Sequence, residues 1–144
     1  SMTSSTSWRE FFTIVMLTSF FSISIFAQID SSEVDDSPYS VIYNHLYYLQ
    51  HDSYEPEKAA LSFPDIGLDN EQVASLLKGY LDGKGYYIDI NRIPSSPDYI
   101  DSTSSESIYY LNKAEPLVYV EKKGGSWSYS ITTTKQKEKG IPKI

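Results

Sequence analysis

The Gly-Gly dipeptide at Gly124 and Gly125 constrains the fold of this chain more than any other feature of its sequence. Glycine tolerates the positive φ angles of a two-residue hairpin turn, and β-forming residues flank the pair over residues 117–132. We therefore predict a β-hairpin in which Lys123 pairs with Ser126.

This register assigns each side chain of the hairpin to one of two faces, because side chains alternate along a strand. Val120 lies opposite Tyr129 and Val118 opposite Ile131, with Lys122 beside Trp127. These six residues form the predicted buried face. The predicted solvent face consists of Tyr119, Glu121, Ser128 and Ser130.

Helices are predicted ahead of the hairpin. The first begins at Pro38, after a cap at Asp36 or Ser37. A second short helix follows Pro56. The third follows a cap at Asp69. The apolar face of this third helix is expected to contain Val73, Leu76, Leu77, Tyr80 and Leu81, before Gly83 and Gly85 end it.

Two more strands are predicted on either side of a polar loop. The β-forming segment 86–93 precedes the loop 95–106, and the strand 107–111 follows it. Helices followed by antiparallel strands indicate an α+β fold. We expect a small single domain with two or three short helices and an antiparallel sheet that contains the Gly-Gly hairpin.

An uncharged apolar run near the N-terminus predicts export. The run covers residues 11–27, follows Arg9 and ends at the small residue Ala27, as in a signal peptide. The alternative is an uncleaved anchor helix, although the run is short and contains several serines and threonines. We divide the chain into a signal peptide (1–28), a flexible acidic leader (29–36), a globular domain (37–132) and a linker (133–144).

Charge and cysteine content exclude several classes of function. The formal net charge is −7, which disfavours nucleic acid as a partner because phosphates require clustered lysine and arginine. Cysteine is absent, so disulfides, thiolate nucleophiles and cysteine-ligated zinc are excluded.

The residues usually found in catalytic and metal sites do not combine into a motif. His45 and His51 are six residues apart, about 120° around a helix, which does not suit a shared metal ion. His45 is expected to be a packing residue. Asp98 and Asp101 lie in a Ser/Pro-containing loop, where aspartates usually form turns. We assign no catalytic, cofactor-binding or metal-binding residue and predict that the chain is not an enzyme.

Tyrosine is the most unusual component, with 13 in 144 residues. Tyrosines serve both in cores and in protein interfaces. Most are expected in the core. The tyrosines predicted on outer helix and strand faces, and so on an interaction surface, are Tyr47, Tyr48 and Tyr119.

Short segments through most of the chain match a known pattern in order and spacing, over roughly residues 37 to 130. The first group is Ser37-Pro38-Tyr39, Tyr43, His45-Leu46, Leu49-Gln50, Tyr54, Pro56-Glu57 and Ala59-Ala60. The second is Leu81-Asp82-Gly83-Lys84-Gly85, Tyr87, Ile93-Pro94, Pro97, Tyr99 and Asp101. The third is Pro116, Val118-Tyr119, Glu121-Lys122, Trp127 and Tyr129-Ser130. Together they resemble the N-terminal extramembrane region of mechanosensitive ion channels of the small-conductance type from Bacteroidetes. The stretch 132–140 departs from that pattern.

The resemblance implies a periplasmic domain that precedes the pore of an inner-membrane channel. Such a channel opens under membrane tension and releases solutes during hypo-osmotic shock. The expected partners are the rest of the channel polypeptide and neighbouring subunits in a homo-oligomer, with membrane helices beyond Ile144. Two alternatives remain: a free-standing secreted binding module, and a small periplasmic hydrolase that uses Asp98 or Asp101.

Overall fold

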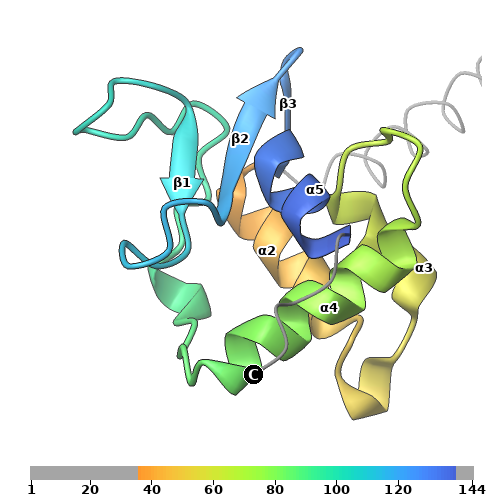
Figure 1. The fold of residues 1–144 in the computed structure, drawn as a ribbon. Coiled ribbons are helices and arrows are strands. Elements are labelled where there is room, and N and C mark those ends of the chain that lie inside the picture. The colour runs from red at the N-terminus through yellow and green to blue at the C-terminus, as the bar shows by residue number, and fades with distance from the viewer. Residues whose placement is uncertain (1–35, 139–144) are drawn as a thin grey trace, which may run out of the picture. The chain divides into compact units, whose positions relative to one another are not determined.

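The computed structural model describes residues 36–138 and confirms the predicted α+β class (Figure 1). Short 3-10 helices are labelled η. The elements in chain order are α2 (Pro38–Tyr47), η1 (His51–Ser53), α3 (Pro56–Ala59), η2 (Ala60–Ser62), α4 (Asn70–Gly83), η3 (Ile90–Arg92), β1 (Ile108–Tyr110), β2 (Tyr119–Lys123), β3 (Ser126–Tyr129) and α5 (Ile131–Glu138). The predicted signal peptide, the leader up to residue 35 and residues 139–144 lie outside the described residues.

The sheet has the strand order β1-β2-β3, and both neighbouring pairs are antiparallel. In the hairpin Lys123 pairs with Ser126 and Val120 with Tyr129, as predicted. Gly124 and Gly125 occupy the turn with φ angles of 62° and 82°, which side chains other than glycine rarely adopt.

The two longest helices begin at the predicted caps. Ser37 accepts a hydrogen bond from the Ser40 N–H at 3.2 Å and begins α2, with Pro38 at the first helical position. Asp69 accepts from the Gln72 N–H at 3.3 Å and begins α4. These side chains satisfy backbone donors that a helix cannot pair within itself.

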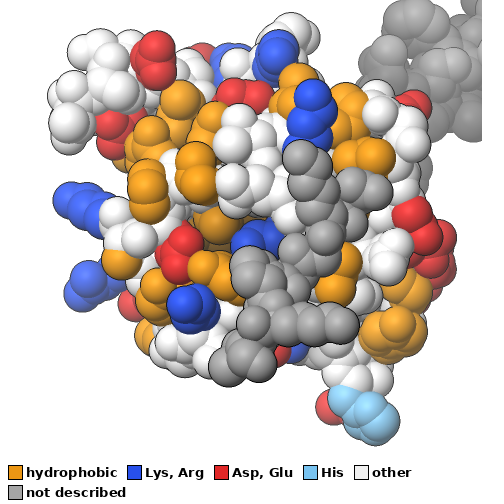
Figure 2. Space-filling view, viewed as in Figure 1, with side chains coloured by type: hydrophobic (Ala, Val, Ile, Leu, Met, Phe, Trp, Pro, Cys, Tyr) orange, Lys and Arg blue, Asp and Glu red, His pale blue; other side chains and the backbone are white. Residues whose placement is uncertain are grey.

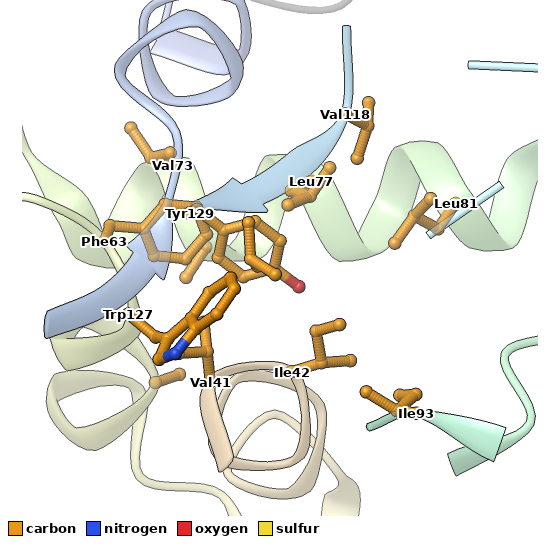
Figure 3. Packing of buried hydrophobic residues seen from close by; sticks show 13 residues of the cluster. Val41, Ile42, Phe63, Val73, Leu77, Leu81, Ile93, Val118, Trp127 and Tyr129 are labelled. Atoms are coloured by element: carbon orange, nitrogen blue, oxygen red, sulfur yellow. The ribbon is translucent and has the colours of Figure 1, made fainter. Parts of the chain in front are cut away.

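The core lies between the helices and the sheet (Figure 3). Val41 and Ile42 of α2 approach it from one side and residues of α4 from another. Val118, Val120, Trp127 and Tyr129 are buried, as the hairpin pattern predicts. Together with these four, the core residues are Val41, Ile42, Ala59, Phe63, Val73, Ala74, Leu77, Leu81 and Ile93.

The predicted strand over residues 86–93 is wrong. Residues 86–89 form no ladder, and the 3-10 helix η3 follows. The Tyr86 N–H donates instead to the Leu81 carbonyl at the end of α4, at 3.1 Å. The Asp89 carboxylate accepts from the Asn91 N–H at 3.1 Å and starts η3. Local capping therefore replaces strand pairing in this segment.

The C-terminal boundary of the predicted hairpin also needs correction. The strand β3 ends at Tyr129. Residues 131 and 132, predicted as the end of the hairpin, and the first residues of the predicted linker from 133 together form α5. Ser130, predicted on the solvent face, is buried and caps α5 by accepting from the Thr133 N–H at 2.9 Å. The expected pair of Val118 with Ile131 does not form, because Ile131 is the first residue of α5.

Figure 1 shows α5 beside α4, and the two helices are in contact. None of the helices within residues 36–138 combines the length and the apolar character that crossing a bilayer requires.

Candidate interaction surfaces and polar clusters

The predicted interaction tyrosines Tyr47 and Tyr48 lie at the C-terminal end of α2. Their rings meet edge to face, with centroids 5.0 Å apart. Tyr47 is 37% exposed, whereas Tyr48 is half-buried and packs against the core. The Lys58 ammonium lies 5.1 Å from the centre of the Tyr48 ring. Of this pair, Tyr47 is therefore the one available to a partner.

Tyr47 belongs to a row of three stacked tyrosines, which we call the tyrosine row: Tyr39, Tyr43 and Tyr47. Consecutive ring centroids are 5.6 and 5.2 Å apart, with interplanar angles of 14° and 13°. The spacing of four residues places these rings on one stripe of α2. Tyr43, in the middle, is 39% exposed. Sequence analysis did not assign Tyr43 to the surface, although the spacing of four was visible.

Tyr119, the third predicted interaction residue, lies on β2 rather than on α2. Its ring is 5.5 Å from that of Tyr110 on β1, the residue it faces across the sheet. Its hydroxyl donates to Thr132 at 3.4 Å. It is half-buried, and its contacts are with the sheet and α5. The structure thus joins Tyr47 and Tyr48 but places Tyr119 in a separate setting.

His45 is fully buried, and both of its ring nitrogens are bonded inside the domain. Nε2 is 2.8 Å from the Ala74 carbonyl, and Nδ1 is 2.9 Å from the Tyr129 hydroxyl. A carbonyl only accepts, so Nε2 carries the proton and Nδ1 accepts from Tyr129. Burial lowers the pKa of His45 to about 4. The predicted packing role is confirmed.

The two loop aspartates occupy turn and surface positions. Asp101 accepts from the Ser104 N–H at 2.8 Å and from the Ser104 hydroxyl at 3.0 Å. These bonds lower the pKa of its carboxyl group. Asp98 is exposed and lies 3.7 Å from the Lys122 ammonium. Both contacts are those of a structural loop.

A polar cluster that sequence analysis missed links α4 to α5. Glu115 accepts from the Tyr80 hydroxyl at 2.6 Å and from the Tyr86 hydroxyl at 3.0 Å. The hydrogen bond between the two side chains raises the pKa of Tyr80 to about 12 and lowers the pKa of Glu115. The Lys137 ammonium of α5 lies 3.4 Å from the centre of the Tyr80 ring. The members of this polar cluster are spread over residues 80–137, so no local motif identifies them.

Lys137 is the least solvent-accessible charged side chain of this cluster, at 5% exposure. Burial lowers its pKa, and the positive charge of Lys84 acts in the same direction. Contact with the face of an aromatic ring partly compensates a buried cation for lost hydration. In this cluster the cation–π contact of Lys137 with Tyr80 joins α5 to α4, and the bond from Tyr80 to Glu115 ties α4 to the segment before β2.

An open pocket of about 440 Å³ lies near the end of β1. It is lined by Tyr87, Ile88, Asp89, Arg92, Tyr109 and Leu111. On the face of the domain shown in Figure 2, hydrophobic side chains are interspersed with charged ones. Within residues 36–138 no group of histidines, aspartates and glutamates is arranged to hold a metal ion.

Comparisons of the chain with protein-family models, with curated proteins and with solved structures find no match.

Proposed function

We propose that residues 36–138 form a non-catalytic periplasmic domain of a mechanosensitive channel of the small-conductance type. The observation that carries this proposal is that residues from different segments of the resemblance bond to one another across the fold. Contacts between those residues are what the likeness leads us to expect if the matching segments define one domain.

The first link joins α2 to the segment after η3. Ser37 and Pro38 begin α2. The Tyr39 N–H, one of the helix donors that lack an internal partner, donates to the Pro94 carbonyl at 3.0 Å. Two separate matching segments, Ser37-Pro38-Tyr39 and Ile93-Pro94, therefore meet at the start of one helix.

The second link joins α2 and the polar loop to β3. His45 on α2 bonds the Tyr129 hydroxyl at 2.9 Å. Trp127 donates its indole N–H to the Pro97 carbonyl at 2.9 Å. These residues determine how helices, loop and sheet fit together, and this supports a shared fold rather than a shared chemistry.

In this proposal the tyrosine row on α2 contacts a neighbouring subunit. Tyrosines combine an apolar ring with a polar hydroxyl and have few rotatable bonds, so they are enriched in protein interfaces. The net charge of −7 disfavours binding to an anionic lipid surface. A protein partner is therefore the more suitable one for this face.

Cysteine cross-linking tests the proposed contact. Residues 1–144 contain no cysteine, so Tyr43→Cys supplies the single reactive site of this part of the protein, in a background from which any cysteine outside these residues has been removed. We expect this variant of the natural full-length protein, oxidised in its own membrane, to form disulfide-linked dimers. The control is Glu57→Cys, an exposed position on α3, which should stay monomeric on a denaturing gel. Equal cross-linking at both positions, or at neither, would contradict the contact.

A second candidate is a free-standing secreted binding module. The exposed tyrosines and the open pocket near β1 favour it, because both could serve a soluble binding protein. A stop codon directly after the codon for Ile144 in the natural gene would favour this alternative.

A further inference from the structure

The pocket near the end of β1 combines aromatic, aliphatic and charged side chains in a small space. The segment 87–89, η3 and the end of β1 form its walls. In Figure 1 the segment that carries η3 lies close to the C-terminal end of β1. Its volume of about 440 Å³ is within the range of about 300–1,000 Å³ that is usual for small-molecule sites.

Two tyrosine rings in this pocket differ in how firmly they are held. Tyr109 is half-buried, and its ring meets Tyr99 edge to face at 5.9 Å. Burial raises the pKa of Tyr109, so its hydroxyl stays protonated at neutral pH. Tyr87 is 88% exposed. Tyr109 is thus a packed wall of the pocket and Tyr87 an exposed rim, and both rings offer an aromatic face to the C–H groups of a saturated ligand ring.

The charged side chains of the pocket form a donor and acceptor pair. The Arg92 Nε lies 3.5 Å from the Asp89 carboxylate, and the Arg92 side chain is 86% exposed. The remaining guanidinium N–H groups are therefore free to donate to a ligand, and the carboxylate can accept from ligand hydroxyls. The two charges offset each other, so the site favours a ligand without net charge.

These features together indicate a sugar. We infer that this pocket binds a short neutral glycan, with one ring stacked on Tyr87 and Tyr109 and its hydroxyls bonded to Asp89 and Arg92. A purely apolar ligand would remove water from this charged pair without hydrogen-bonding to it. An anionic ligand would meet a protein of net charge −7. The inference goes beyond the proposed function and rests on the geometry of the pocket rather than on the contacts that carry the channel assignment, so it holds or fails independently of that assignment.

The test is an NMR titration of the full 144-residue chain with a neutral tetrasaccharide of β-1,4-linked N-acetylglucosamine. We expect shifts of the backbone amides of residues 86–92 and 109–111 that saturate at millimolar or lower ligand. Tyr87→Ala and Arg92→Gln should each weaken binding by about tenfold, a loss of about 1.4 kcal/mol. Both side chains are exposed, so both variants should fold.

The matched control is Tyr54→Ala, which removes a tyrosine that is 60% exposed and outside the pocket lining. It should leave the affinity unchanged. The inference is overturned if about 10 mM tetrasaccharide shifts no pocket amide. It is also overturned if Tyr87→Ala and Tyr54→Ala have equal effects, or if a uronic-acid tetrasaccharide binds more tightly than the neutral one.

Discussion

His45 shows how a single buried side chain can connect three elements. Its ring bonds the Ala74 carbonyl on α4 and the Tyr129 hydroxyl on β3, while its own backbone belongs to α2. The ring also meets Phe63 and Tyr129 edge to face, with centroids 5.2 and 5.1 Å away. Histidine is suited to this position because its two nitrogens accept and donate in opposite directions.

The buried His45 makes stability depend on pH. Its pKa is about 4 in the folded chain, against 6.5 as the ordinary value, so between these values the unfolded state binds more protons. The stabilisation of the folded state by neutral His45 is complete above pH 6.5 and is lost as the pH falls towards 4. We expect the free energy of unfolding to fall by about 2 kcal/mol between pH 8 and pH 5. Urea denaturation at a series of pH values measures it.

The His45→Gln variant serves as the control for this dependence. Its amide cannot titrate, so its unfolding free energy should be lower but nearly constant over the same range. A wild-type slope that persists in His45→Gln would show that another group is responsible.

Tyr129→Phe tests the other end of the same bond. The change keeps the ring but leaves the buried His45 Nδ1 without a donor. An unsatisfied buried acceptor costs about 1–3 kcal/mol, and we expect a loss of that size in chemical denaturation at pH 7. Tyr54→Phe, at an exposed ring, should be neutral. A neutral Tyr129→Phe would mean that the bond contributes nothing to stability.

At the scale of elements, α5 is attached mainly by polar contacts. The Thr133 hydroxyl donates to the Leu117 carbonyl at 2.8 Å and accepts from the Tyr119 N–H at 3.1 Å. If the hairpin continued, the backbone N–H of Tyr119 would donate to the Ser130 carbonyl. That carbonyl instead accepts from the Thr134 N–H inside α5. The Thr133 hydroxyl therefore takes the place of the backbone carbonyl that would accept from the Tyr119 N–H in a longer strand.

Thr133→Val should detach α5 from the sheet while keeping the shape of the side chain. It leaves the Leu117 carbonyl and the Tyr119 N–H without their partner, and we expect a loss of about 2 kcal/mol. Hydrogen exchange of the amides of residues 131–138 should become faster. Gln136→Ala, at an exposed position on the same helix, should change stability by less than about 0.5 kcal/mol. Unchanged exchange in Thr133→Val would refute this description of α5.

The sequence was sufficient to predict elements whose signals are local. The glycine turn, the cap at Ser37 and the apolar stripe of α4 are each readable within a few residues, and the structure has all three. By contrast, α5 has a polar sequence and depends on Thr133 and Lys137 reaching distant partners. Residues 86–93 have strand propensity but pair with no strand, because tertiary contacts outweigh intrinsic preference. The pocket residues likewise come from three segments with no motif in common.

At the scale of the whole molecule, the described residues form one core with two surfaces of interest on different elements. The tyrosine row lies on α2, and the pocket lies at β1 and η3. The row is proposed to contact a neighbouring subunit and the pocket a glycan. Neither requires chemistry at a reacting centre, which agrees with the proposed role as an interaction domain.

The natural reading frame beyond the codon for Ile144 tests this account most directly. A channel requires membrane-spanning segments of about 20 apolar residues each. We expect several such segments downstream, one of them rich in small residues. A stop codon, or a continuation without any apolar segment of that length, would contradict the proposed function.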